Sequence, residues 1–183
     1  AYMDIVEKRL IDLGFDVKRG DERYTGSKAL SARVTEANRW KADLYYVAHT
    51  NAGGGRYSMT MCYDSEESIA KANVIHKYRK CVLSHKVVTR PDLYEINATA
   101  MPCLYDELFF HDNAEDCEWF HREGMAKMAE ETVQALCELC GVKYTPEPAG
   151  KLYRVQVGAY AVYENAVEMQ KKLKADGYDA IIV

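Results

Sequence analysis

Apolar side chains recur at helical spacing along much of the chain. In residues 2–13 they stand three or four positions apart and Gly14 follows as a stop, so this stretch predicts an amphipathic helix. The same spacing predicts helices at residues 27–40, 65–82, 118–141 and 163–177. The side chains expected to face inward are Ile5, Val6, Leu10 and Leu13 in the first helix, Leu30, Val34 and Ala37 in the second, and Met125, Met128, Thr132, Leu136 and Cys140 in the fourth.

Short apolar or alternating runs between these helices predict strands. They cover residues 15–19, 43–49, 57–64, 92–97, 101–108, 152–158 and 178–183. Helices that alternate with strands cover both faces of a sheet. We therefore expect an α/β fold with a mixed, mostly parallel sheet flanked by helices on both faces.

A stretch with two prolines and a glycine breaks this periodicity. We interpret residues 144–150 as a linker between a domain at residues 1–143 and a smaller one at residues 151–183. The smaller part is one β-α-β unit of about 33 residues, too short to be stable alone, so we expect it to be half of a domain. The chain also starts inside a helical pattern and stops inside an apolar strand, which predicts a fragment at both ends.

The net charge narrows the possible binding partners, and the cysteines indicate the redox conditions in which the chain folds. The net charge is −4 and the isoelectric point is about 5.8, which disfavours nucleic acid and anionic membrane surfaces as partners. No apolar run reaches the roughly 20 residues that span a bilayer, and no signal peptide opens the chain. Six cysteines lie scattered through apolar segments, which favours reduced, buried thiols and folding in a reducing cytosol.

Two chemically capable side chains stand at the ends of predicted strands. His49 ends one strand and Glu107 ends another, and in open α/β sheets ligands gather at the carboxyl ends of strands. An imidazole binds zinc well, and a nearby carboxylate can take a proton from zinc-bound water. A single histidine at such a position is more often structural, so these residues alone leave the structural interpretation standing.

The sequences of two longer segments resemble those of a known protein family. "LSARVTEANRWKADLYYVAHTNA" and "MPCLYDELFFHDNAED" resemble the zinc-dependent N-acetylmuramoyl-L-alanine amidases, which cleave peptidoglycan. The resemblance covers essentially residues 1–143, including a strand that would end at Arg19. The matching positions are Leu30, Arg33, Asn38, Ala42, Asp43, His49, Asn51, Ala52, Met101, Pro102, Glu107, Leu108, Phe110 and Asn113.

The resemblance implies a zinc site built from two histidines and a glutamate, with a second glutamate as general base. By motif position His49 corresponds to the last zinc ligand, Glu107 to the catalytic base, and Asn51 and Ala52 to the substrate-binding side. The other histidine and the ligand glutamate are expected upstream of Ala1. We do not assign the ligand role to Glu7, so we expect weak zinc binding or none in these 183 residues.

Two positions depart from the family pattern. Phe109 stands where a glycine is usual, and Asp106 replaces an apolar residue next to Glu107. Asp106 could raise the pKa of Glu107, or it could point to the opposite face of the strand, because neighbouring side chains alternate. We expect residues 53–55 to form a flexible rim of the cleft rather than a phosphate cradle.

The remaining histidines receive no role in this interpretation. His111 follows Glu107 by four residues, but a surface or supporting position is preferred. His76 and His121 fall on predicted helices and His85 in a predicted loop, where solvated side chains are the simpler expectation.

The segment after the linker has a resemblance of its own. "LYRVQVGAYAVYENAVEMQKKLKADGYDAIIV" is similar to the first half of the SPOR domain, a ferredoxin-like β-α-β-β-α-β fold that binds peptidoglycan glycan strands. A tether to an insoluble substrate raises the effective concentration of an enzyme there.

Both resemblances imply a peptidoglycan amidase of the cell wall or the extracellular space. Two alternatives stay open. The protein could be an inactive wall-binding or regulatory relative, or a phage endolysin or mother-cell lytic enzyme made in the cytosol and released at lysis.

Overall fold

The computed structural model describes residues 1–20, 23, 25–147 and 156–182. Contacts within the chain divide it into two units, Ala1–Thr145 and Pro146–Val183, and we describe each by itself. No helix among the described residues is long and apolar enough to cross a bilayer.

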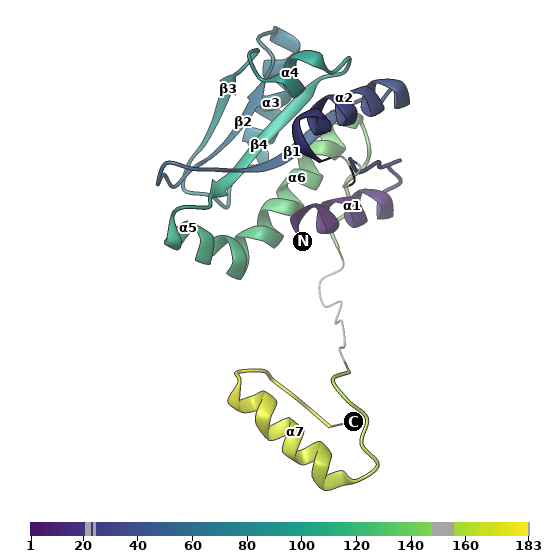
Figure 1. The fold of residues 1–183 in the computed structure, drawn as a ribbon, viewed down its shortest axis with the longest axis vertical. Helices are drawn as coiled ribbons and strands as arrows, with labels where there is room; N and C mark the ends of the chain where they lie inside the picture. The colour runs from purple at the N-terminus through teal and green to yellow at the C-terminus, as the bar shows by residue number, and fades with distance from the viewer. Residues whose placement is uncertain (21–22, 24, 148–155, 183) are drawn as a thin grey trace. The chain divides into compact units, whose positions relative to one another are not determined.

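The first unit is built on a four-stranded sheet (Figure 1). Its strands are β1 (Tyr45–Asn51), β2 (Ser58–Cys62), β3 (His85–Thr89) and β4 (Cys103–Phe110), in the order β1-β4-β2-β3. β1 pairs with β4 and β2 with β3 in parallel, whereas β2 and β4 are antiparallel. The predicted mixed, mostly parallel sheet is confirmed.

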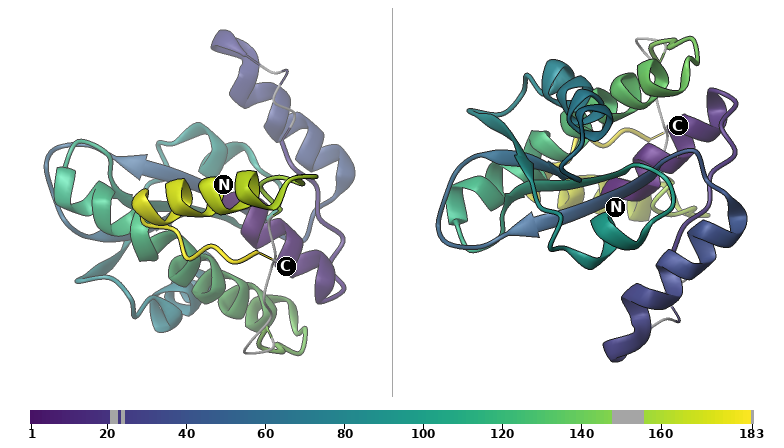
Figure 2. Two further views of the ribbon diagram at one scale, coloured as in Figure 1. Left: turned by 90° about the horizontal axis from the view of Figure 1, so that it is seen from below. Right: turned by 90° about the horizontal axis from the view of Figure 1, so that it is seen from above.

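Helices cover both faces of this sheet, as Figure 2 shows for α3 and α6 on one side and α4 on the other. The helices are α1 (Tyr2–Asp12), α2 (Ala29–Trp40), α3 (Glu66–Tyr78), α4 (Tyr94–Ala98), α5 (Ala114–Trp119) and α6 (Met125–Cys140). A 3-10 turn, η1 (Gly26–Lys28), precedes α2, and a π-helical turn, η2 (Phe120–Gly124), joins α5 to α6. The helix predicted at residues 118–141 is therefore one continuous helical run with a π-turn in it.

The alternation of side chains along the strands gives the sheet two distinct faces. The face packed by α1, α3 and α6, here called the rear face, buries Leu104 and Cys62 against Ala72, Ile75 and Ala135. The face packed by α4, here called the front face, buries Met61 and Cys103 against Ile96. Successive residues of β4 consequently belong to two different cores.

Two predicted strands are wrong. Residues 92–97 form mainly the short helix α4, and Ile96 packs on the front face as a helical residue. Residues 15–19 adopt no strand, although Phe15 and Val17 do pack against the rear core. Burial of alternate side chains produces the period of two there without a hydrogen-bonded neighbour, so the sequence pattern resembles that of a strand.

Three further predictions about side chains also fail. Leu30 is 44% exposed rather than inward, and Cys140 at the end of α6 is exposed, while Cys137 takes the buried position. His85 does not lie in a solvated loop but begins strand β3, and its side chain is 1% exposed. Val34, Ala37, Met128, Thr132 and Leu136 are buried as predicted.

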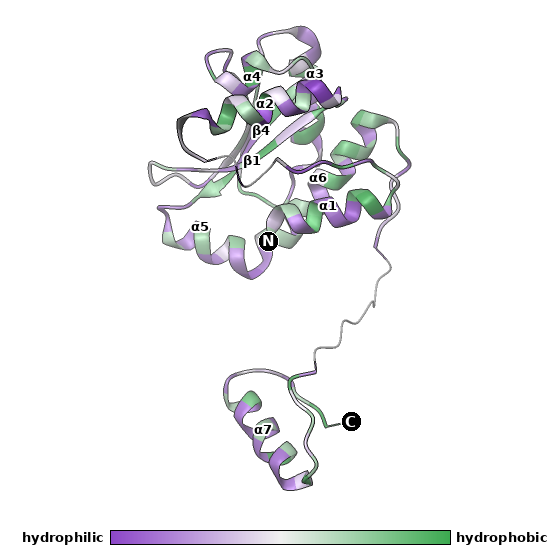
Figure 3. Ribbon diagram, turned by 45° about the vertical axis from the view of Figure 1, so that its right-hand side comes forward, coloured by the Kyte–Doolittle hydropathy of each residue, from purple (hydrophilic) through white to green (hydrophobic). Residues whose placement is uncertain are grey.

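The second unit contains α7 (Tyr163–Ala175), in agreement with the helix predicted there. The helix carries hydrophobic and hydrophilic residues along its length (Figure 3), but none of its side chains is fully buried. No strand forms at residues 156–158 or 178–182, and residues 152–155 of the predicted first strand lie outside the described residues. A strand needs a paired neighbour, and the described part of this unit provides too little buried surface to hold one.

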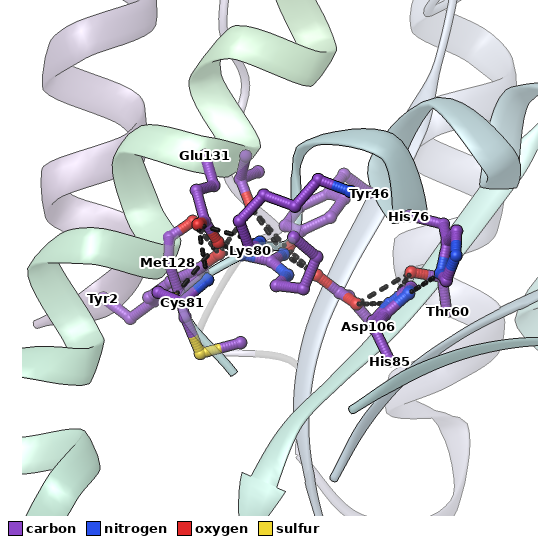
Figure 4. A network of polar contacts seen from close by, with 12 residues as sticks. Tyr2, Tyr46, Thr60, His76, Lys80, Cys81, His85, Asp106, Met128 and Glu131 are labelled. Carbon is purple, nitrogen blue, oxygen red and sulfur yellow. Dashed lines mark hydrogen bonds and ion pairs between the residues drawn. The ribbon is translucent and has the colours of Figure 1, made fainter. Parts of the chain in front are cut away.

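A polar network crosses the rear face beneath β4 (Figure 4). Asp106 accepts hydrogen bonds from Arg79 at 2.5 Å, from Tyr46 at 2.8 Å and from Thr60 at 2.9 Å, and both charged side chains are fully buried. Arg79 also donates to Thr132 and to the Met128 carbonyl, both at 2.8 Å. The Asp106–Arg79 ion pair thus connects neighbouring strands to α6, where Glu131 lies 3.6 Å from Arg79 as a second anion.

The network continues toward the surface through two histidines. The hydroxyl of Thr60 donates to Asp106, so its oxygen must accept from Nε2 of His85 at 3.0 Å. Nδ1 of His85 then lies 2.9 Å from Nδ1 of the exposed His76. His85 is therefore a structural residue.

Removing Asp106 should destabilise the fold strongly, because the buried Arg79 would lose its nearest counter-ion and keep only Glu131 at 3.6 Å. We expect Asp106→Ala to lower the free energy of unfolding by about 3–5 kcal/mol in urea titrations. The double variant Arg79→Met/Asp106→Leu should recover most of that loss, because an apolar pair has no charge to desolvate. Asp92→Ala, at an exposed ion pair with Arg90, is the control and should change stability little. Equal losses in both aspartate variants would contradict the assignment.

The Asp106–Arg79 pair also determines how the stability of the fold responds to acid. Burial by itself would raise the pKa of Asp106, but Arg79 and the hydrogen bonds from its neighbours lower it to about 2. A carboxyl whose pKa is lower in the folded state stabilises the fold above its unfolded pKa, and that stabilisation is lost as the pH falls. We expect the contribution of Asp106 to disappear between about pH 4 and pH 2. The difference in melting temperature between wild type and the double variant across this interval measures it.

Candidate functional site

His49 and Glu107 lie side by side on the front face. Their Cα atoms are direct partners across β1 and β4, and Glu107 is in turn the partner of Met59 on β2. Met59 pairs with Lys86 on β3. Directly paired residues point to the same face, so an imidazole, a carboxylate, a thioether and an ammonium group form one row across four strands.

The imidazole of His49 is exposed, and one of its nitrogens is already used. Its Nδ1 lies 2.8 Å from the carbonyl oxygen of Thr50. A carbonyl can only accept, so Nδ1 carries the hydrogen and Nε2 keeps its lone pair. A hydrogen bond from one nitrogen to a backbone carbonyl is the usual way in which a metal-binding histidine is oriented. The ring of Tyr105 lies 5.5 Å away and flanks the imidazole.

Glu107 is half-buried, and its environment favours the protonated form. Partial burial raises the pKa of Glu107 above its ordinary value, while electrostatic interactions with His49 and Arg90 act in the opposite direction. Asp106 adds only the smallest upward contribution. The alternation of β4 places Asp106 on the rear face, where Arg79 neutralises it, so the carboxylate next to Glu107 in sequence is not its partner in space.

The glycine-rich segment after β1 is held by a carboxylate. The amide hydrogens of Gly53 and Gly54 point at Asp112, with nitrogen-to-oxygen distances of 2.6 and 3.1 Å. These bonds lower the pKa of Asp112. The segment is fastened to the loop after β4 rather than free, and its amides are already occupied by a protein anion. Asp112 therefore occupies the two glycine amides that an external anion would otherwise use.

Asn51 and Ala52, the predicted substrate-binding residues, stand where β1 ends. The side-chain oxygen of Asn51 accepts the backbone hydrogen of Ala52 at 2.8 Å, and the Asn51 carbonyl accepts from the backbone of His111 at 3.0 Å. Their role toward a substrate stays a prediction.

Phe109 has a packing role. Its ring stacks on that of Phe120 in the π-helical turn, with 4.1 Å between centroids and 16° between planes. A bulge in the pairing with β1 between His49 and Asn51 turns the end of β4, so Phe109 joins the rear core. The large side chain at this position connects the end of β4 to the turn before α6.

The other histidines contact residues outside the row. His111 is exposed, and its Nδ1 lies 3.0 Å from the hydroxyl of Thr50. His121 is exposed beside the rings of Phe109 and Phe120. Lys86 was missed by sequence reasoning, because β3 itself was not predicted and no local signal connects residue 86 to Glu107.

The described residues do not complete a metal site. Among residues 1–20, 23, 25–147 and 156–182, no cluster of three histidine, cysteine, aspartate or glutamate side chains could hold an ion. His49 has the free nitrogen and orientation of one ligand, and Glu107 stands beside it. Glu7 is engaged by Arg19 at 3.2 Å and contributes no ligand to the row.

Comparison with known proteins identifies the family. A family model for N-acetylmuramoyl-L-alanine amidases (Amidase_3) matches residues 2–138, well over half of the chain. The chain belongs to the N-acetylmuramoyl-L-alanine amidase family. A SPOR domain model matches residues 126–183 and so overlaps the last helix of the first unit.

Individual relatives agree with this assignment. The chain is 26% identical over 160 residues to the N-acetylmuramoyl-L-alanine amidase CwlM of Bacillus licheniformis, covering 85% of this chain and 62% of the relative. It is 26% identical over 175 residues to a sporulation-specific N-acetylmuramoyl-L-alanine amidase of Bacillus subtilis, covering 91% of this chain and 66% of the relative. The chain thus spans somewhat less than two thirds of the length of each.

Solved structures share the fold. The catalytic domain of the amidase CwlV from Bacillus (Paenibacillus) polymyxa superposes with a TM-score of 0.69 at 24% identity, covering 78% of this chain and 82% of that one. The catalytic domain of the CD27L endolysin, which targets Clostridia difficile, gives a TM-score of 0.65 at 22% identity, with 75% and 79% covered.

Removing Asp112 should loosen the site's rim without unfolding the sheet. We expect Asp112→Ala to speed hydrogen exchange of the Gly53 and Gly54 amides at least tenfold, because both lose their acceptor. The amide of Thr60, inside β2, should exchange at the wild-type rate. Glu118→Ala, at an exposed pair with Arg122, is the matched control. Unchanged exchange at both glycines would show that Asp112 does not hold the segment.

Proposed function

We propose that the protein of which these residues form part is a peptidoglycan hydrolase. It would cleave the amide bond between the lactyl group of N-acetylmuramic acid and the L-alanine of the stem peptide. The observation that carries this proposal is the direct pairing of His49 with Glu107 on one face of the sheet, in a chain of the amidase family.

Glu107 is our candidate for the general base. A carboxyl with a raised pKa accepts a proton more readily than an ordinary carboxylate, and it can later return that proton to the leaving amine. Its half-buried position beside the exposed His49 leaves it open to a substrate approaching the front face. Asn51 and Ala52 would contact the substrate at the rim.

We further propose Zn²⁺ as the cofactor. His49 fits one ligand position, because its Nε2 is free and its ring is oriented by Thr50. The described residues do not contain the rest of a ligand set. In this proposal the remaining histidine and glutamate come from residues upstream of Ala1. Zinc, when bound, supplies an activated water and polarises a carbonyl.

The second unit supports a wall-associated role. We assign residues 1–143 to the catalytic domain, residues 144–150 to a linker and residues 151–183 to the first half of a SPOR domain. The glycan strands of peptidoglycan would be its ligand, and the cell wall or extracellular space its place of action. Release at lysis, as for an endolysin or a mother-cell enzyme, fits the six free cysteines equally well.

An inactive wall-binding or regulatory protein is the alternative. It is favoured by the absence of a complete ligand set among the described residues. The full-length protein distinguishes the two, because only an amidase releases stem peptides from purified peptidoglycan.

Replacing Glu107 by glutamine should abolish hydrolysis in the full-length protein. We expect at least a 100-fold loss of stem-peptide release, because glutamine cannot take up a proton. The zinc content should stay unchanged, because Glu107 is not a ligand in this proposal. Glu118→Gln is the control on an exposed helix. Retained release in the Glu107 variant would refute the assignment.

The 183 residues by themselves should hold zinc weakly. We expect well below one equivalent of metal after purification and desalting, as measured by elemental analysis. His49→Ala should reduce what remains, and His121→Ala should not. Stoichiometric zinc in the wild-type chain would contradict the assignment of its missing ligands.

A further inference from the structure

Lys86 completes the front-face row that contains His49 and Glu107. It pairs with Met59, which pairs with Glu107, so Lys86 stands two strands from the carboxylate on the same face. With adjacent strands about 4.8 Å apart, the two Cα atoms are separated by about 10 Å. Val88, two residues later on β3, packs into the front core, which fixes the facing of Lys86.

An aromatic ring positions the ammonium group of Lys86. The hydrogen-bond donors of that group stay available. Its Nζ lies 4.0 Å from the centroid of Tyr57, and this ring is held edge-on against Phe110 at 4.8 Å. A cation over a ring face is oriented without its three N–H groups being consumed. The side chain is exposed where β3 begins.

Neighbouring cations are already engaged by carboxylates. Arg90 is held by Asp92 through two bonds of 2.8 Å, and Arg56 pairs with Glu115. Among the salt bridges of the described residues, Lys86 takes part in none. Lys86 is therefore the cation of this row that can pair with an external anion.

We propose that Lys86 is a substrate-binding residue that recognises a free carboxylate of the stem peptide. This inference rests on the proposed function and names the part of the substrate that its site selects. An ammonium group pairs well with a carboxylate through charge-assisted hydrogen bonds. The chain carries a net charge of −4, so an anionic peptide needs a local cation in order to bind.

The spacing defines which carboxylate Lys86 can reach. An extended peptide advances about 3.4 Å per residue, so 10 Å corresponds to about three residues. A carboxylate about three residues from the scissile amide therefore lies opposite Lys86 when the peptide runs along this row with that amide at Glu107. Muropeptides in which this carboxylate is converted to a carboxamide should bind more weakly.

The test compares a carboxylate muropeptide with its carboxamide form, using the full-length, zinc-loaded protein. We expect wild type to favour the carboxylate form about tenfold in KM at similar kcat. Lys86→Met should abolish this preference by raising KM for the carboxylate form only, and Lys86→Arg should restore most of it. Lys127→Met, at an exposed lysine on α6, is the matched control. Calorimetric binding of both muropeptides to metal-free protein provides a readout that needs no turnover.

The outcomes separate this inference from the proposed function. Equal hydrolysis of both muropeptides by wild type and by Lys86→Met would overturn the role of Lys86 and leave the amidase function standing. Carboxylate-selective binding that Lys86→Met abolishes, in a protein that hydrolyses neither form, would support Lys86 and refute the amidase function. An equal loss of affinity for both forms in Lys86→Met would also overturn the inference.

Discussion

The buried ion pair between Asp106 and Arg79 is the constraint on which the rest of the first unit depends. A charged pair without solvent contact needs partners for its other polar atoms, and here Tyr46, Thr60 and Thr132 provide most of them, with only Nε of Arg79 left without a hydrogen bond. These partners come from β1, β2 and α6. Any rotation of β4 about its axis would separate the charges, so the side chains of β4 can point to the two faces of the sheet in only one way.

The orientation of the β4 side chains determines the candidate site. With Asp106 committed to the rear, Glu107 must point to the front, beside His49. The helices that bury the rear core pack on the face opposite to Glu107 and His49. The short helix α4 covers only the neighbouring part of the front face. The chemically capable row therefore stays accessible because a stable polar network occupies the opposite side. Phe109 and Asp112 then hold the end of β4 and the glycine-rich segment around it.

Elements with a strong period were predictable, and those defined by their neighbours were not. α1, α3, α6 and α7 follow from apolar spacing, and β1, β2 and β4 from compact apolar runs. β3 was missed because its five residues begin with a histidine and a lysine, whose environments only the folded chain provides. The segment at residues 92–97 has the composition of a strand but lies over the front face, where a helical turn buries Ile96.

The sequence by itself determined the family, the α/β class and the two residues at the centre of the candidate site. Local periodicity and motif spacing carry that information, because each depends on residues close together in the chain. Tertiary structure alone decided which neighbours those residues have. It separated Asp106 from Glu107 by strand alternation, buried His85 in a network and brought Lys86 into the row. Such pairings depend on strand order and register, which arise when distant segments pack together and which no local pattern encodes.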